Sequence, residues 1–379
     1  MNILLIISSN EGTIAGCAYQ LYRGILKEAP EHKVYVVCYG KYSENGFNFG
    51  SNCFKLSILR KNKFSSIILR TIILKRIKCK YKINNSISTQ VGASVWNVLS
   101  SVGEFKTGIF HAILEQAKAA SLKRYISFYV VYNTILKFLN KKIGVSQKVV
   151  QDINRYIGGG ELAYNIHDVT LIREKSTLQL PDIHGRLFNY PVILYVGRLY
   201  EKIKAPSRLL EAFAIFKSKI QENCQLVYIG PDDNGTMANL NVQAEKLGLR
   251  DCVHFIGQTS NPYKYMKRAK FLVSPSRDEG LPGVLIESLL LKVPCVATNS
   301  TLGNWEIMQC EKHYNPNLKE IFSTPFGYIT PNIIEDETYT IKMLAKGMLV
   351  CYYSKDIDFS SFDESRFSSK IIVDKIIRI

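Results

Sequence analysis

Short apolar runs alternate with segments of helical periodicity along almost the whole chain, and this alternation constrains the fold most strongly. In the first half it predicts strands at 3–8, 34–39, 108–113 and 142–145, and helices at about 15–28, 116–139 and 146–156. Strands that are separated by helices are typical of a parallel sheet covered by helices. The sequence therefore predicts an α/β fold.

The alternation restarts behind "HGRLFNYP" (184–191), which is interpreted as a linker. Strands are expected at 192–197, 224–230, 252–257, 270–276 and 294–298, with helices at 205–219, 237–249, 262–269 and 283–292. A domain with a single hydrophobic core rarely grows beyond about 250 to 300 residues. The length of 379 residues therefore predicts two domains. They are placed at 1–186 and 187–360, each doubly wound and Rossmann-like, with a helix at 361–379.

Composition is that of a folded globular protein, with 46% hydrophobic and 21% charged residues. The nine cysteines are scattered without C-x-x-C or zinc spacing, which predicts reduced thiols in a cytosolic protein. The N-terminal "MNILLIISSN" lacks the features of a secretory signal. The apolar stretch 125–139 falls short of the roughly 20 residues that a spanning helix needs, so no transmembrane segment is expected.

Basic residues gather in one part of the chain, whose net charge is +17. Between residues 45 and 103 there are ten Lys/Arg and no acidic residue before Glu104: Lys55, Arg60, Lys61, Lys63, Arg70, Lys75, Arg76, Lys78, Lys80 and Lys82. They are interleaved with large aliphatic residues, which favours an anionic membrane surface as the partner of the Lys55 to Lys82 region. A solvated basic surface is the alternative, and no motif of a nucleic-acid-binding fold supports nucleic acid.

Two carboxylates stand eight positions apart in "PSRDEGLPGVLIESLLLKVPCVATNS" (275–300), which follows a predicted strand. Gly280 and Gly283 allow the backbone to approach a ligand closely, and the free N–H groups of the following helix suit a phosphate. Glu279 can accept a hydrogen bond from a sugar hydroxyl, and Glu287 can accept from the vicinal hydroxyls of a ribose. Without a ligand, a backbone cluster would have to pair the buried Glu287.

This stretch resembles the E-x7-E signature of the retaining glycosyltransferases of family 4, which share the two-domain GT-B fold. Gly303 and Glu306 follow in register, and "ILYVGRLYEKIKAPSRLLEAF" is similar to the same family's G-R-L…K-G…L-L-x-A-F segment. The match is strong over about residues 190–310. It implies a ligand between two facing domains and a C-terminal helix, 361–379, that packs back on the N-terminal domain.

The resemblance also implies roles for single residues. Arg198 and Lys204 would clamp the donor diphosphate, with Lys202 as a competitor of Lys204, and charge stabilisation of a departing diphosphate fits both. Two positions depart from the family's pattern, since Ala205 and Lys292 stand where glycine is usual.

Further positions complete the predicted site. His111, at the end of a strand, would face the transferred sugar, although a strand-end histidine is otherwise more often a surface or core residue. Gly16 would let the backbone approach the phosphates, with an ordinary strand-to-helix connection as the alternative. The predicted catalytic set is Glu279, His111, Arg198 and Lys204, and the donor-binding set is Gly16, Arg198, Lys204, Gly280, Leu281, Gly283, Val284 and Glu287.

No metal site is expected. Asp356 and Asp358 have D-x-D spacing but lie near the C-terminus, and Asp232 and Asp233 follow a strand without a third ligand nearby, so both pairs are interpreted as solvated loops.

The resemblance thus implies a metal-independent, retaining hexosyltransferase without a cofactor, whose donor is a nucleotide-sugar, with UDP favoured. Its acceptor would be a lipid-linked saccharide of lipopolysaccharide, O-antigen or capsule synthesis. The expected location is cytoplasmic, at the inner face of the cell membrane. The alternatives are another GT-B enzyme, such as an epimerase or phosphorylase, and a non-catalytic membrane-binding protein.

Overall fold

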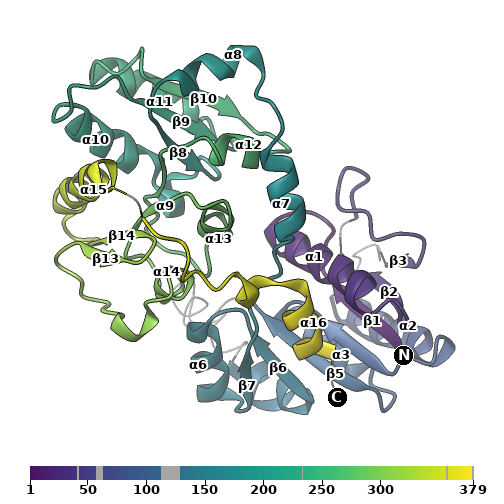
Figure 1. The fold of residues 1–379 in the computed structure, drawn as a ribbon. Coiled ribbons are helices and arrows are strands. Elements are labelled where there is room, and N and C mark those ends of the chain that lie inside the picture. Colours follow the sequence, from purple (N-terminus) through teal and green to yellow (C-terminus); the bar gives the residue numbers. More distant parts are fainter. Residues whose placement is uncertain (41, 57–62, 112–128, 233, 356, 378–379) are drawn as a thin grey trace. The chain divides into compact units, whose positions relative to one another are not determined.

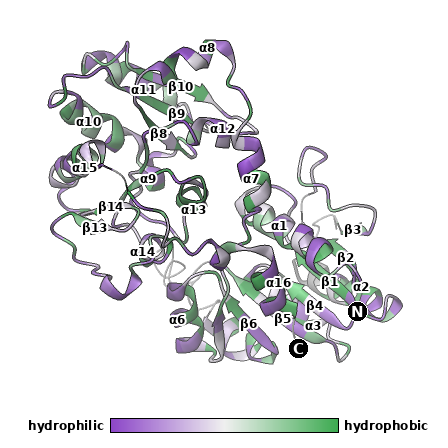
Figure 2. Cartoon of the chain, in the orientation of Figure 1, coloured by the Kyte–Doolittle hydropathy of each residue, from purple (hydrophilic) through white to green (hydrophobic). Residues whose placement is uncertain are grey.

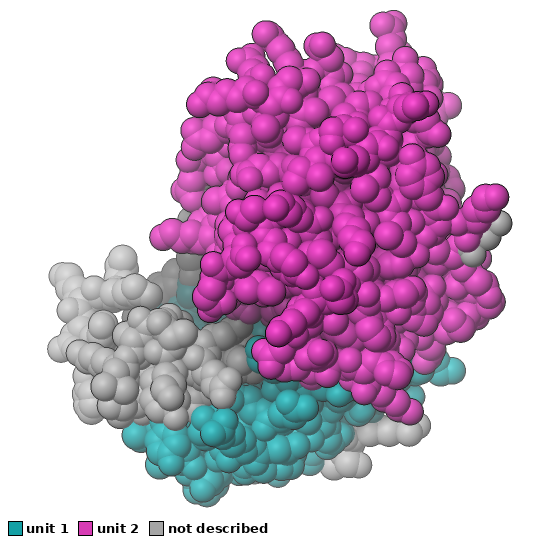
Figure 3. All heavy atoms as spheres, turned by 90° about the vertical axis from the view of Figure 1, so that its left-hand side faces the viewer, with its two compact units in different colours: residues 1–168, 365–379 teal, residues 169–364 magenta. Residues whose placement is uncertain are grey.

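The computed structural model describes all residues except 41, 57–62, 112–128, 233, 356 and 378–379. The chain forms two compact units, coloured separately in Figure 3. Unit 1 contains Met1–Asp168 and Ser365–Ile379, and unit 2 contains Val169–Glu364. Among the described residues, each unit holds one seven-stranded sheet, so the predicted α/β fold class is confirmed.

The sheet of unit 1 is parallel throughout, with the strand order β3-β2-β1-β4-β5-β6-β7. Its strands are β1 (Asn2–Ile7), β2 (Lys33–Cys38), β3 (Cys53–Lys55), β4 (Asn85–Ser88), β5 (Phe105–Phe110), β6 (Lys141–Gly144) and β7 (Gly160–Leu162). Four of them match the four predicted strands of this half with shifts at their ends. The three short strands β3, β4 and β7 were not predicted, because none is a sustained apolar run.

Helices cover both faces of this sheet: α1 (Thr13–Glu28), α2 (Lys63–Lys80), α3 (Val91–Leu99), α6 (Gln147–Tyr156) and α16 (Ser369–Ile377). Ile3 and Leu5 pack against α1 and α16, whereas Leu4 and Ile6 pack against α2 and α3. Because β1 is buried on both faces, its sequence from Ile3 onward is a continuous run of apolar residues. Ser146 caps α6 as predicted, its Oγ accepting from Val149 N at 3.4 Å.

The sheet of unit 2 has the order β10-β9-β8-β11-β12-β14-β13, in which only β13 is antiparallel. Its strands are β8 (Val192–Val196), β9 (Gln225–Ile229), β10 (Val253–Gly257), β11 (Phe271–Ser274), β12 (Cys295–Thr298), β13 (Phe322–Thr324) and β14 (Gly327–Thr330). The first five were all predicted. Figure 2 shows hydrophobic residues gathered in strands of both sheets and in helix α13 (Gly283–Leu290).

The helices of unit 2 are α7 (Val169–Ser176), α8 (Asp182–Gly185), α9 (Glu201–Lys204), α10 (Pro206–Lys217), α11 (Thr236–Lys246), α12 (Tyr263–Met266), α13 (Gly283–Leu290), α14 (Leu302–Ile307) and α15 (Glu337–Tyr353). Helices α10 and α15 lie together on one face of the sheet (Figure 1). Leu210, Phe213 and Leu344 belong to the core beneath them. Helix α7 contacts α12 and α13.

The chain passes from unit 1 to unit 2 at Asp168, whereas the sequence placed the boundary at 186/187. Helix α7 belongs to unit 2 because Asn261 Nδ2 donates to Lys175 O at 2.9 Å and Arg268 donates to Ser176 O at 3.3 Å. The predicted linker, 184–191, instead carries a helical turn at Arg186–Asn189. The C-terminal helix α16 packs on α1 within unit 1, where Ser369 Oγ donates to Glu28 Oε1 at 2.5 Å.

The predicted helix 116–139 falls largely outside the described residues. Of its described part, residues 129–134 are α-helical and Leu136–Phe138 forms a 3-10 helix. Within the described ranges, no helix combines the length and the apolar character that crossing a bilayer requires.

Candidate functional site

The loops that leave the carboxyl ends of β8, β9 and β10 are joined to one another by backbone hydrogen bonds. Gly197 N donates to Ile229 O at 2.9 Å, and Gly230 N donates to Gly257 O at 2.9 Å. Gly230 has a φ of +150°, and a Cβ there would lie 1.8 Å from Gly197 O, so only glycine fits. This edge of a parallel sheet is where such folds bind ligands.

Lys204 and Glu279 meet at this edge, although 75 residues separate them. Lys204 Nζ lies 2.5 Å from Glu279 Oε1, and Ser276 Oγ donates to the same oxygen at 2.7 Å. The two side chains are 28% and 11% exposed. Lys202 is exposed, so the structure brings Lys204 rather than its competitor to the predicted acid.

Arg198 lies two residues beyond β8, and its carbonyl accepts from Tyr195 Oη at 2.6 Å. Arg198 as a whole residue is exposed. Its role at the diphosphate stays a prediction.

Ala205 and Lys292, which stand where the family has glycine, both adopt the left-handed backbone conformation. Ala205 has a φ of +45° and Lys292 a φ of +58°. Residues other than glycine pay about 1 to 2 kcal/mol for this conformation. The two positions thus keep the backbone that a glycine would favour.

Backbone contacts fix the turn between β11 and α13. Thr301 Oγ1 donates to Gly280 O at 3.2 Å, and a Cβ on Gly303 would lie 2.5 Å from that oxygen. Pro282 is the N-cap of α13. The N–H groups of Gly283 and Val284 open the helix and have no acceptor within it, as an anion site requires.

Glu287 lies one turn into α13, where Tyr263 Oη donates to its Oε1 at 3.2 Å. Burial raises the pKa of Glu287 to about 7, against a lowering effect of this hydrogen bond. Ionising the Glu287 carboxyl group is therefore costly unless further hydrogen-bond donors reach it. The vicinal hydroxyls of a ribose would be such donors. Tyr263 was not predicted, because nothing in the sequence pairs α12 with α13.

His111 follows β5 in unit 1 and lines a small cavity of about 20 Å³ together with Cys17, Thr89 and Ile376. Burial lowers the pKa of His111 to about 4, so its ring is neutral near pH 7. It is suited to hydrogen bonding and not to pairing with a negative charge.

Gly16 lies inside the first turns of α1, and its N–H donates to Gly12 O at 3.0 Å. This backbone donor is therefore used within the helix, and the approach of the Gly16 backbone to the phosphates stays a prediction. The N–H groups without an acceptor in the helix belong to the residues just before it.

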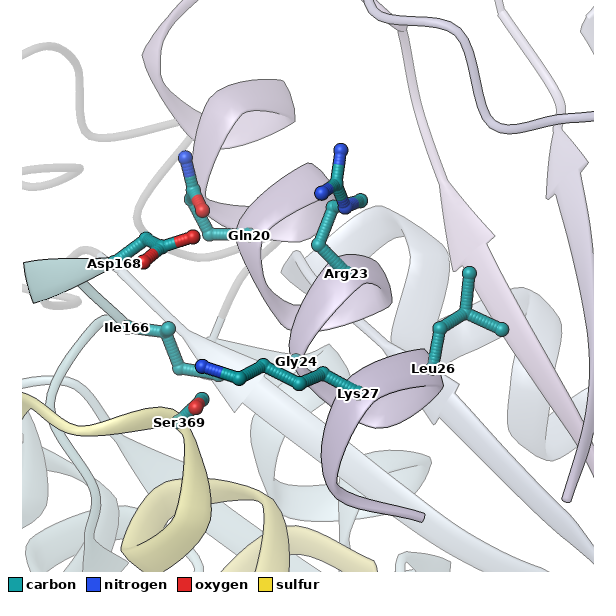
Figure 4. Close-up of a pocket in the computed structure, with 8 residues that line it drawn as sticks. All are labelled: Gln20, Arg23, Gly24, Leu26, Lys27, Ile166, Asp168 and Ser369. Atoms are coloured by element: carbon teal, nitrogen blue, oxygen red, sulfur yellow. The ribbon is translucent and has the colours of Figure 1, made fainter. Parts of the chain in front are cut away.

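A larger pocket, of about 280 Å³, lies elsewhere in unit 1. Figure 4 shows the side chain of Lys27 extending from α1 towards Ile166 and Ser369, while the Asp168 carboxylate points towards Gln20. None of the predicted site residues is among those that line it.

The discounted acidic pairs have local partners. Asp232 accepts from Thr236 N at 2.8 Å and from Met237 N at 3.2 Å, so it caps the start of α11. Asp358 accepts from Ser360 N at 2.8 Å. Asp233 and Asp356 lie outside the described residues.

Three charged residues beside the site were missed by the sequence reasoning. Arg208 of α10 is fully buried and pairs with Glu337 at the start of α15, which also pairs with Arg277 of the β11–α13 turn. The sequence offers one signal, an arginine in the largely apolar stretch "RLLEAFAIF".

A family model described as "Glycosyl transferases group 1" matches residues 179–316. An uncharacterized glycosyltransferase of Methanocaldococcus jannaschii is 25% identical over 267 residues, which are 69% of this chain and 60% of that protein. The chain thus spans about 60% of that relative's length.

A Campylobacter jejuni relative is 34% identical over 39% of this chain and 37% of its own length. It is named N-acetylgalactosamine-N,N'-diacetylbacillosaminyl-diphospho-undecaprenol 4-alpha-N-acetylgalactosaminyltransferase. Among solved structures, Anabaena HepE in complex with UDP and glucose matches with a TM-score of 0.68 at 16% identity, over 99% of this chain and 95% of that chain. The chain therefore carries a glycosyl transferases group 1 domain over residues 179–316 and has the GT-B fold.

Proposed function

We propose that this protein is a retaining glycosyltransferase that moves a sugar from a nucleotide-sugar to a lipid-linked glycan acceptor in cell-surface polysaccharide synthesis. The observation that carries the proposal is the convergence of Lys204, Ser276 and Glu279 beside the N-terminus of α13. One cation, one acid and a row of free N–H groups match the phosphates and hydroxyls of such a donor.

The transfer breaks the bond between the anomeric carbon and the leaving phosphate oxygen and forms a bond to the acceptor oxygen. The acceptor oxygen attacks from the face that the phosphate leaves, so the configuration is retained without a protein nucleophile. The acceptor's proton passes to the leaving phosphate, so no protein base is needed. Arg198 and Lys204 stabilise the negative charge that develops on the diphosphate. Because these side chains supply the positive charge, we propose that the reaction needs no metal.

Glu279 and Glu287 orient the donor. Glu279 accepts from a hydroxyl of the transferred sugar, and Glu287 accepts from the ribose hydroxyls, which favour ionisation of its carboxyl group. His111 keeps the role that the resemblance implies, as a neutral hydrogen-bonding partner of the sugar. Positioning of the donor supplies most of the rate.

UDP is the favoured nucleotide, because a solved protein of the same fold was crystallised with UDP and glucose. A lipid-linked acceptor is supported by the Campylobacter relative, whose name specifies an undecaprenol-linked substrate.

The described surface of α2 supports attachment to a membrane. Ile68, Leu69 and Ile72 are 50%, 45% and 43% exposed, and Lys75 and Arg76 follow as exposed residues one turn further along. Exposed aliphatic residues beside cations favour an anionic lipid surface at the cytoplasmic face. The side chains of Lys61 and Lys63, also in the predicted basic segment, lie outside the described part of the structure.

The test is a panel of nucleotide-sugars, each incubated with and without lipid-linked saccharides, with release of the nucleoside diphosphate as the readout. Release that depends on an acceptor supports a transferase. A new nucleotide-sugar formed without an acceptor would identify an epimerase instead, and consumption of no donor would contradict the enzymatic proposal.

A further inference from the structure

Every carbonyl from Ser274 to Arg277, at the end of β11, accepts a hydrogen bond from a side chain elsewhere in unit 2. Thr298 Oγ1 donates to Ser274 O at 3.3 Å and to Ser276 O at 2.6 Å. Arg208 Nη1 donates to Pro275 O at 3.0 Å, and Asn332 Nδ2 donates to Arg277 O at 2.9 Å. The backbone that leads to Glu279 is therefore fixed at four successive residues.

The Arg208 guanidinium is the centre of this arrangement. Its side chain is 0% exposed, and its Nε and Nη2 donate to the two carboxylate oxygens of Glu337 at 3.0 and 2.7 Å. Its Nη1 also donates to Asn332 Oδ1 at 2.9 Å. One buried cation thus joins α10, the start of α15 and the β11 turn.

Arg277 closes the network from the turn itself. Its Nη1 donates to Glu337 Oε2 at 2.8 Å, and its backbone N donates to Ile203 O at 2.7 Å, one residue before Lys204. The segment that carries Lys204 and the turn that carries Glu279 are thereby tied to each other. Although burial raises the pKa of Glu337, its hydrogen bonds from Arg208 and Arg277 hold that pKa below its ordinary value.

Buried ion pairs are a poor means of gaining stability, because desolvating the charges offsets much of their attraction. A planar guanidinium, however, fixes both partners in direction as well as distance. The three charged side chains around the 274–277 turn are therefore better explained by the geometry that they impose on it than by a contribution to stability.

We propose that Arg208, Glu337 and Arg277 are positioning residues that hold the 274–277 backbone so that Glu279 meets Lys204 and the donor. This inference rests on the proposed function. None of the three residues needs to touch the donor, since they act through the turn.

The test compares Arg277→Met, Glu337→Gln and the double variant with the wild-type protein. Arg277→Met leaves the Arg208–Glu337 pair in place, so it keeps the test interpretable if Glu337→Gln folds poorly. We expect kcat to fall by about 10- to 100-fold through misplacement of Glu279. Donor KM should change less than about threefold, and the double variant should lose no more than the worse single variant.

Arg250→Met is the matched control, because it breaks an exposed pair with Glu245, 3.3 Å apart, and should leave kcat unchanged. Arg277→Lys keeps the charge and can restore a single contact with Glu337, so it should recover part of kcat.

Hydrogen exchange of amides 274–283 gives a readout that does not depend on activity. Faster exchange in Arg277→Met, together with the loss of kcat, supports the inference. If the wild-type protein turns over a donor but Arg277→Met leaves either kcat or the exchange unchanged, the inference is overturned. If the wild-type protein consumes no donor, the proposed function fails, and the exchange alone decides whether the network holds the turn.

Discussion

Lys204 Nζ lies 2.5 Å from Glu279 Oε1, so the cation predicted to hold the donor diphosphate is paired with the acid predicted to hold the donor sugar. Without a donor, each of the two groups satisfies the other. In the proposed function a donor competes with this pair, because its phosphates attract Lys204 and its sugar hydroxyl donates to Glu279. We therefore expect the ion pair to lower the affinity for a nucleotide that carries no sugar.

Glu279→Gln should bind UDP more tightly than the wild-type protein, because Lys204 loses its competing negative charge. An ion pair of this exposure contributes up to about 1 kcal/mol, which corresponds to a roughly fivefold lower dissociation constant. Calorimetric titration with UDP measures it. The control is Glu335→Gln, an exposed carboxylate outside the site, which should leave the affinity unchanged. Weaker UDP binding in Glu279→Gln would contradict the competition.

Glu287 should make the protein less stable as pH rises. Burial raises its pKa from 4.5 to about 7, so between these values the folded protein holds a proton that the unfolded chain has lost. Its contribution to stability is complete below pH 4.5 and is lost as pH approaches 7.

Glu287→Gln removes this titration. Its Tm should therefore fall less than that of the wild-type protein between about pH 5 and pH 8. Thermal unfolding at both pH values checks this, with the exposed Glu335→Gln as a control that should follow the wild-type protein. Parallel curves for Glu287→Gln and the wild-type protein would contradict the raised pKa of Glu287.

Lys292→Gly should stabilise the protein, because Lys292 is exposed and has a φ of +58°. Relief of the left-handed conformation should raise the free energy of unfolding by about 1 kcal/mol. Lys246→Gly, at the end of α11, is the matched control and should lower it by up to about 1 kcal/mol. Urea denaturation gives both values, and a loss of stability in Lys292→Gly would contradict the strain.

The basic residues of α2 should divide into two classes: exposed residues that bind an anionic membrane, and a buried residue that stabilises the fold. Lys75, Arg76 and Lys80 are exposed, and replacing all three with glutamine should weaken binding to anionic vesicles by about 100-fold, at about 1 kcal/mol per charge. Vesicle sedimentation measures this. Undiminished binding of the triple variant to vesicles would contradict membrane docking through α2.

Lys78 belongs to the second class. It is buried, with its Nζ 2.5 Å from Glu104 Oε1 and 2.8 Å from Asn97 O. Lys78→Met should lower the free energy of unfolding by about 3 to 5 kcal/mol, since it leaves Glu104 buried without its cation. Urea denaturation measures it, and an unchanged free energy of unfolding would contradict the buried pair.

Local patterns in the sequence predicted much of unit 2. The strand–turn–helix around Glu279 and Glu287 is one continuous stretch, and its apolar runs, glycines and proline suffice to place it. The pairing of Glu279 with Lys204 was approached only through the family resemblance, which assigned both residues to one donor.

Long-range partners could not be predicted. Glu337 lies 129 residues from Arg208, and no periodicity within either helix indicates that they meet. The role of Gly16 stays a prediction, because the N–H groups that a phosphate could use depend on where α1 begins, and helix ends are poorly defined by sequence. The boundary at 186/187 relied on Pro191 and turn residues, whereas the contacts of α7 with α12 and α13 assign it to unit 2.

The central claim is that Glu279 and Glu287 hold a nucleotide-sugar at the edge of the unit 2 sheet. The most direct test is the rate of UDP release from the preferred donor in the wild-type protein, Glu279→Gln and Glu287→Gln. The account predicts a fall of about 100-fold or more in Glu279→Gln and a clear rise in donor KM in Glu287→Gln, with both variants folded. Wild-type turnover and KM in both variants would contradict it.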